Sequence, residues 1–426
     1  MLDKIIEILK DSGVHAWEIN DVTTKGWEFY FIRHALDQHR AKNVEHIYVT
    51  VYQLIEDGQF MGNASAELPL TASYDEAKKL IGDLAYRATL VKNRPYTLNP
   101  PRPGKPISTP VDPAAISEEF ICSMQELPET EGEDVNSYEI FVSDKTVRFL
   151  NSEGVDVTER YPDSMIEVVV NARRDGHEIE LYRSFDSGSC DGEGLKRELK
   201  KAMAYGRDRL VTVPTPALGK ADVLFSGSDA CTIYEFFTDR CDAAMVFRGL
   251  SDWQPGKPIA ENVQGDLVTV CTRRELPNSS QNRGFDREGA PIRDAAVLKD
   301  NVPVEILGSR MFSSYMGLEN SFIPGNVEVS GGTRSAEEIR SGKYLECVEF
   351  SDFQVDALTG DIFGEIRLAY LHDGDTVTPV SGGSVSGSMF DFLNDLSMSR
   401  EQTQYNNMLI PSLTLFRNVT VTGAES

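Results

Sequence analysis

The stretch CTIYEFFTDRCD, from Cys231 to Asp242, combines carboxylates at helical spacing with a run of hydrophobic side chains. We expect a helix near residues 229–247, on which Glu235 and Asp239 would lie one turn apart and share a face. Two carboxylates in that arrangement can hold a hard cation. Because the stretch offers no third ligand and no histidine, the pattern favours an ordinary polar helix face.

A second candidate is the glycine- and serine-rich stretch PVSGGSVSGSMFDFL, from Pro379 to Leu393. A loop of this kind that enters a helix can bind an anion at the helix N-terminus. It lacks the lysine of a P-loop, and Ser386 falls one place late for the G-x-S-x-G pattern of serine hydrolases. We therefore expect a tight structural turn.

The cysteines and histidines suggest no metal centre of their own. The six cysteines contain no C-x-x-C pair, which argues against a zinc knuckle or a redox dithiol and suits reduced, buried thiols. His177 in DGHEIELY resembles the start of H-E-x-x-H, but the second histidine is absent and the segment predicts a strand.

The charge of the chain restricts its partners. The 426 residues carry a formal net charge of −25, from 67 acidic and 42 basic residues. Such a surface repels phosphate backbones and anionic lipid, so we expect no nucleic-acid partner and no membrane partner. No segment approaches the ~18 consecutive apolar residues of a membrane span. The N-terminal MLDKIIEILKDSG predicts an amphipathic helix and not a signal peptide, so we expect a cytoplasmic protein.

The first half of the chain repeats itself at an offset of about 120 residues. AWEI from Ala16 is echoed by SYEI from Ser137, and IYVTVYQLIEDG from Ile47 is echoed by IEVVVNARRDG from Ile166. Each copy predicts a leading helix, strands of period two and a closing amphipathic helix. We therefore predict two copies of one α+β unit, although similar patterning alone could mimic a duplication.

The rest of the chain divides by composition. The proline-rich RPYTLNPPRPGKPISTPVDP predicts an extended connector between the copies. After about Val213, strands broken by glycine dominate, with a short helix in SMFDFLNDLSM. The predicted fold is α+β, with a first repeat at 1–94, the connector at 95–113, a second repeat at 114–214 and a β-rich C-terminal domain at 215–426.

Five C-terminal segments, taken in order, resemble the TldD/PmbA family. RGFDREGAP and the strand AAVLKDNVPVEIL are similar to the family's F-D-x-E-G-x-P loop and the strand after it. PGNVEVSGGTRSAEEI resembles its Gly-Asn segment and the following helix, and DALTGDIFGEI resembles its T-G-D-F turn. HDGDTVTPVSGGSVSGSMFDFLNDL is similar to its P-V…G-N-x-x-D-x-L loop and helix, and PSLTLFRNVTV to its closing strand. The resemblance in layout covers essentially the whole chain.

The resemblance also implies where a metal site would lie. The family's active member, TldD, is a cytosolic zinc metalloprotease whose helix carries H-E-x-x-x-H, with a further cysteine ligand near the C-terminus. On this sequence the motif falls on Tyr234, Glu235 and Asp239, so only the glutamate matches. The cysteine region is SREQTQYNNMLIPSL, which contains Asn406 and Asn407 and no cysteine. These five positions therefore read as a degenerate metal site without catalytic residues.

The resemblance implies a TldE/PmbA-like subunit that binds no cofactor itself and is inactive alone. Its partner would be a TldD-type metalloprotease subunit that holds the zinc, and the complex would act in proteolysis or maturation of small unfolded peptides. A homodimeric peptide-binding module and a self-sufficient hydrolase with an unrecognised site are the alternatives. The family's older label, modulator of DNA gyrase, does not require DNA contact, and the charge of −25 speaks against it.

Overall fold

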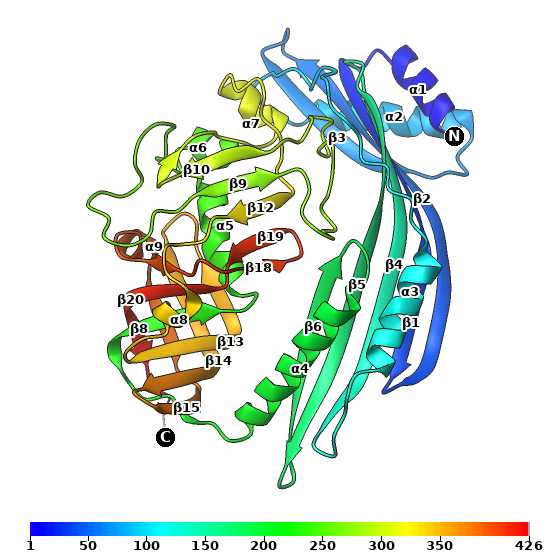
Figure 1. Ribbon diagram of the computed structural model, residues 1–426. Helices are drawn as coiled ribbons and strands as arrows, with labels where there is room; N and C mark the ends of the chain where they lie inside the picture. Colours follow the sequence, from blue (N-terminus) through cyan, green and yellow to red (C-terminus); the bar gives the residue numbers. More distant parts are fainter. Residues whose placement is uncertain (425–426) are drawn as a thin grey trace.

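The N-terminal half is built around one curved antiparallel sheet of six strands, on the right of Figure 1. The computed structural model describes residues 1–424. The strand order is β3-β2-β1-β4-β5-β6, so the first strand of each half lies at the centre. The elements of this half are α1 (Leu2–Asp11), β1 (Ala16–Ile32), β2 (Ala35–Ile55), β3 (Phe60–Leu68), α2 (Tyr74–Ala88), α3 (Pro113–Gln125), β4 (Glu133–Asn151), β5 (Asp156–Arg174), β6 (His177–Ser187) and α4 (Gly192–Arg209).

The helices α1 to α4 cover one face of this sheet. Side chains alternate along a strand, so Ile19 and Phe31 of β1 lie on the same face. Ile19 belongs to a buried cluster with α1 and α2, and Phe31 belongs to a second cluster with α3 and α4. The apolar faces of the four helices therefore pack against this face of the sheet.

Both halves of the sheet follow the same order of elements, namely a helix, three antiparallel strands and a second helix. The central strands β1 and β4 pair along their length, from Glu18 opposite Asn151 to Ile32 opposite Ser137. This order is what a duplication requires, and the duplication itself stays a prediction.

The C-terminal half is rich in β-structure and contains a barrel (Figure 1). One sheet has the order β11-β10-β9-β12-β19-β18. In the other, the order β13-β8-β20-β16-β14 closes into the barrel because β13 also pairs with β14, while β15 and β7 extend from β14. The helices are α5 (Ala230–Arg240), α6 (Ala243–Phe247), α7 (Arg310–Tyr315), α8 (Ala336–Ile339) and α9 (Met389–Phe392). The strands are β7 (Val213–Pro214), β8 (Gly219–Ser226), β9 (Val270–Arg273), β10 (Ala295–Lys299), β11 (Val302–Pro303), β12 (Asn326–Val329), β13 (Tyr344–Val355), β14 (Asp361–Asp373), β15 (Thr376–Ser381), β16 (Ser384–Ser388), β17 (Ser397–Met398), β18 (Gln402–Tyr405), β19 (Met408–Pro411) and β20 (Leu413–Thr422).

The prediction of a single helix near residues 229–247 was wrong, because two helices, α5 and α6, form there. The helix is interrupted at Asp242, whose backbone is extended. The Asp242 carboxylate accepts hydrogen bonds from the N–H groups of Ala244 (2.8 Å) and Met245 (3.3 Å). This is an N-cap, and it starts α6 in a new direction. The N–H of Ala243 also donates to the carbonyl of Leu307 (2.8 Å), a contact far away in sequence.

The six cysteines of the described chain are unpaired, and Cys122 is exposed, which corrects the expectation that all are buried. Among residues 1–424, no helix is long and apolar enough to cross a membrane.

Candidate functional site

Helix α5 has a core-facing side and a polar side. Its residues Ile233, Phe236 and Phe237 are buried in the main C-terminal core. Glu235 and Asp239 are exposed, and the i, i+4 spacing places them on one face, as predicted. Apolar and polar side chains recur at helical spacing in this stretch because only one side of α5 packs against the core.

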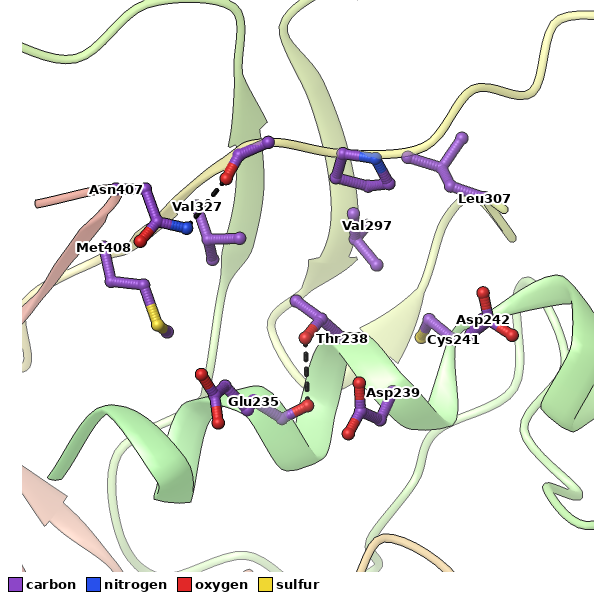
Figure 2. A pocket seen from close by; sticks show the side chains of 12 residues that line it. Glu235, Thr238, Asp239, Cys241, Asp242, Val297, Leu307, Val327, Asn407 and Met408 are labelled. Atoms are coloured by element: carbon purple, nitrogen blue, oxygen red, sulfur yellow. Dashed lines mark hydrogen bonds between the residues drawn. The ribbon is translucent and has the colours of Figure 1, made fainter. Parts of the chain in front are cut away.

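A cavity of about 340 Å³ lies along the polar side of α5 (Figure 2). Its acidic wall comes from Glu235, Asp239 and Asp242. The opposite wall is mostly apolar and comes from β10, β12, β19 and two loops. The complete lining is Glu235, Thr238, Asp239, Cys241, Asp242, Val297, Leu307, Pro324, Gly325, Val327, Asn407 and Met408.

Tyr234 does not face this cavity. Its side chain is buried, and its hydroxyl lies 2.7 Å from the hydroxyl oxygen of Thr414 on β20. The five-residue separation of positions 234 and 239 turns a helix by about 140°, so the two side chains diverge. Of the motif positions on α5, only Glu235 and Asp239 reach the cavity.

The two asparagines sit in the turn between β18 and β19 and have different roles. Asn407 lines the cavity and donates its amide to the carbonyl of Gly325 at 2.8 Å (Figure 2). The side chain of Asn406 bonds to Ser280 instead, accepting from its N–H and donating to its hydroxyl, both at 2.9 Å. Asn406 has a positive φ of 47°, which asparagine tolerates better than most residues.

The electrostatics of the cavity are negative. Reduced hydration in the cavity raises the pKa of Asp239, and the nearby carboxylates of Glu235 and Asp242 raise it further, although the side chain still reaches solvent. Within the described chain, no lysine, arginine or histidine forms an ion pair with Glu235 or Asp239. The two carboxylates are therefore free to meet a cationic or hydrogen-bond-donating group from outside.

The lining residues offer little for hydrolysis by this chain. The hydroxyl of Thr238 donates to the carbonyl of Glu235 in the same helix at 2.9 Å. Burial raises the pKa of Cys241 to about 12, so its thiol stays protonated. The lining, all of it within the described residues, contains no imidazole that could act as a general base.

The zinc ion that the resemblance implies for TldD does not fit this donor set. Zinc favours imidazole nitrogen and thiolate sulfur, usually from three protein ligands at a catalytic site. Here the nearest cysteine is held as a thiol, Tyr234 points into the core, and the remaining donors are carboxylates and one amide. Within residues 1–424, no three histidine, cysteine or acidic side chains converge to hold a metal ion.

Arg240 fixes the C-terminal end of α5. Its guanidinium is buried, donates to Asp252 at 2.6 Å and to the carbonyl of Ala357 at 3.0 Å, and lies over the rings of Trp253 and Phe390 at 5.1 and 4.9 Å. Cation–π contacts of a desolvated guanidinium stabilise such an arrangement. These contacts anchor the C-terminal end of α5, whose acidic face lies along the cavity.

The glycine- and serine-rich stretch and the loop RGFDREGAP lie outside the cavity. Within the glycine- and serine-rich stretch, Gly382 and Gly383 form a tight turn at positive φ, as predicted, whereas Ser384–Ser388 form β16 and Met389–Phe392 form α9. A Cβ at Gly383 would lie 2.2 Å from the carbonyl oxygen of Thr422, so only glycine fits there. Sequence reasoning missed Asp242 and the apolar wall, because their approach to α5 depends on the tertiary fold.

The sequence comparison identifies the C-terminal half. Residues 218–423 match the family model described as the PmbA/TldA metallopeptidase C-terminal domain. This range contains α5, the whole cavity and the barrel. No protein of curated function is significantly similar to the chain in sequence.

Solved structures share the fold over nearly the whole chain. TldE from Thermococcus kodakarensis superposes with a TM-score of 0.76 at 17% identity, covering 99% of this chain and 100% of that chain. A protein from Thermotoga maritima MSB8, described as a candidate modulator of a DNA gyrase, gives 0.76 at 17% identity and covers 99% of each chain. A protein of the same description from Bacteroides thetaiotaomicron VPI-5482 gives 0.79 at 15% identity, covering 99% of this chain and 98% of that chain. At these identities, the likeness establishes a common fold.

Proposed function

Because the chain belongs to the PmbA/TldD family, we propose that it is the TldE-like, non-catalytic subunit of a TldD/TldE-type metalloprotease complex. The observation that carries the proposal is the donor set along α5. The positions that correspond to the family's zinc ligands hold Tyr234, Asp239 and an asparagine of the β18–β19 turn. None of these side chains supplies the neutral nitrogen or thiolate that zinc favours.

In this proposal the zinc belongs to the partner. A TldD-type subunit with H-E-x-x-x-H would supply a metal-bound water whose pKa is lowered to about 7. The present chain contributes structure, closing one wall of a shared chamber. An open strand such as β18, the last in its sheet order, suits pairing with the backbone of an extended substrate.

The proposed substrates are small, unstructured peptides, which the complex would degrade or mature in the cytoplasm. The net charge of −25 weighs against nucleic acid and anionic membrane as partners. The acidic wall formed by Glu235, Asp239 and Asp242 supports contact with amino or guanidinium groups of a peptide.

Reconstitution tests the proposal. Mixed with a TldD-type protein, the chain should form a stable heterodimer measurable by size-exclusion chromatography with light scattering. Peptide cleavage by the pair should be lost when the glutamate of the partner's H-E-x-x-x-H is replaced by glutamine. Full activity of the partner without this chain would contradict the proposal.

The same experiment separates the two alternatives. A homodimeric peptide-binding module would bind peptides as a dimer of this chain and would not form a complex with the TldD-type protein. A self-sufficient hydrolase would cleave peptides with no partner present, through Glu235 and Asp239 with a histidine brought from elsewhere.

We also propose that the two halves of the N-terminal sheet are copies of one ancestral unit. The echo of AWEI by SYEI and the shared order of helix, three strands and helix support this. Superposition of residues 16–91 on residues 138–211 should align β1 with β4, β2 with β5 and β3 with β6. A better match in any other strand order would contradict the duplication.

A further inference from the structure

The loop RGFDREGAP has no part in the α5 cavity and joins the two halves of the molecule. The N–H of Gly284 donates to the carboxylate of Glu159 on β5 at 2.7 Å. Gly289 has a φ of 76°, and a Cβ there would lie 2.6 Å from the ring of Phe149 on β4. Asn99 of the connector donates its amide to the carbonyl of Glu288 at 3.0 Å. We call this contact the seam, defined by Glu18, Tyr52, Tyr96, Asn99, Phe149, Glu159 and residues 283–291.

The loop contributes two carboxylates to the seam, that of the buried Asp286 and that of the half-buried Glu288. Asp286 accepts hydrogen bonds from the N–H groups of Glu288 and Ala290 at 2.9 Å and of Ile323 at 2.8 Å. Glu288 accepts one from the N–H of Arg310 at 2.6 Å. Burial raises the pKa of both carboxyl groups, and these hydrogen bonds oppose the rise.

Glu18 faces this loop from the N-terminal sheet. It lies near one end of β1, is partly buried, and accepts a hydrogen bond from the hydroxyl of Tyr52 on β2 at 2.7 Å. The ring of Tyr96 from the connector packs edge-on against Tyr52, with centroids 6.2 Å apart. The charges that face Glu18 from the loop are those of Asp286 and Glu288.

Glu18 has no basic partner within the part of the chain that the structure describes. The positive charge of Arg287 lowers the pKa of both Asp286 and Glu288, and that of Arg310 lowers the pKa of Glu288. In residues 1–424 no basic side chain forms an ion pair with Glu18. The tyrosines stay protonated, because burial raises the pKa of both Tyr52 and Tyr96. Within residues 1–424, the Glu18 carboxyl group has no paired cation, so a proton is what can neutralise it.

We infer that the seam is a proton-dependent latch between the N-terminal sheet and the C-terminal domain, with Glu18 as the titrating group. When Glu18 carries a proton, the sheet and the loop pack without repulsion. When it ionises, its charge is repelled by the carboxylates of Glu288 and Asp286, and the loop is held less firmly on the sheet. This inference is independent of the proposed function.

The direction of the pH effect follows from the pKa. Burial, with smaller effects from Glu288 and Asp286, raises the pKa of Glu18 from 4.5 to about 7, although the Tyr52 hydrogen bond lowers it. The folded protein thus binds this proton more tightly than the unfolded chain does. The stabilisation is fully present below about pH 4.5 and is lost as the pH rises through about 7.

The test compares wild-type protein with Glu18→Gln, which keeps the shape and removes the charge. At pH 8, the variant should melt a few degrees higher than wild type, and this difference should shrink to almost nothing at pH 5. The matched control is Glu28→Gln on the same strand, whose ion pairs with Arg40 and Lys42 lie outside the seam. The control should show no such growth of the difference between pH 5 and pH 8.

Hydrogen exchange locates the effect. At pH 8, peptides spanning residues 284–291 should exchange several-fold more slowly in Glu18→Gln than in wild type, with equal rates at pH 5. Glu288→Gln should also slow exchange at pH 8, since it removes the opposing charge. Parallel melting curves of wild type and Glu18→Gln across this range would overturn the inference, and so would a melting difference without any change of exchange in the loop.

Discussion

Two acidic regions of the molecule differ in how their carboxylates are used. In the seam, Asp286 is only 8% exposed and accepts three backbone hydrogen bonds. Along α5, Glu235 and Asp239 are exposed, and their side chains have no protein partner among residues 1–424. Carboxylates that satisfy buried N–H groups hold the fold, whereas carboxylates left open to a cavity are available to a ligand and dispensable for folding.

The largest effect expected from this contrast is on stability. Asp286→Ala would leave three backbone N–H groups without their acceptor, at a cost of about 3 kcal/mol or more in the free energy of unfolding. Asp239→Ala should change it by no more than about 0.5 kcal/mol, as is usual for exposed positions. Denaturant melts of both variants measure the difference. An equal loss of unfolding free energy in the two variants would contradict the difference between the two acidic regions.

The next effect concerns the support of α5. Arg240→Met should lower the free energy of unfolding by roughly 2–3 kcal/mol, because charge-assisted hydrogen bonds and cation–π contacts are lost together. Arg248→Met serves as control, since Arg248 is exposed although it lies over the ring of Phe312. A loss no greater for Arg240→Met than for its control would show that the buried guanidinium does not fix the helix.

A metal graft sharpens the assignment of the cavity face. Glu235→His with Asp239→His would place two imidazoles one helical turn apart facing the cavity, a pair that binds zinc. Tyr234→His with Asp239→His would not, because position 234 faces Thr414 in the core. Zinc titration followed by calorimetry should give an affinity at least about tenfold higher for the first pair, or about 1.4 kcal/mol. The reverse order would mean that α5 is rotated from the position described here.

Much of the fold could be predicted from the sequence because it depends on local pattern. Alternation along the strands and amphipathic spacing in the N-terminal half predicted helices and strands that form. The pairing of Glu235 with Asp239 on one face likewise follows from helical geometry alone. The break at Asp242 could not be predicted, because it depends on a contact between Ala243 and Leu307, which are distant in sequence.

The remaining parts of the site needed tertiary information. Alignment with the family motif assigned Tyr234 and Asn406 to the site. In the structure, the Tyr234 side chain is hydrogen-bonded to Thr414 and the Asn406 side chain to Ser280, away from the cavity. The seam could not be predicted either, because Glu18 and the loop carboxylates are separated by most of the chain. Neither contact leaves a periodic signal in the sequence.

We propose that this chain does not carry out peptide hydrolysis itself. The direct measurement is cleavage of an unstructured peptide by the purified chain alone, with zinc added and with chelator, alongside the Glu235→Gln variant. We expect no cleavage above background in any of these samples, because Tyr234, Asp239 and Asn407 offer zinc neither an imidazole nor a thiolate. Robust cleavage that chelator abolishes and Glu235→Gln removes would contradict it.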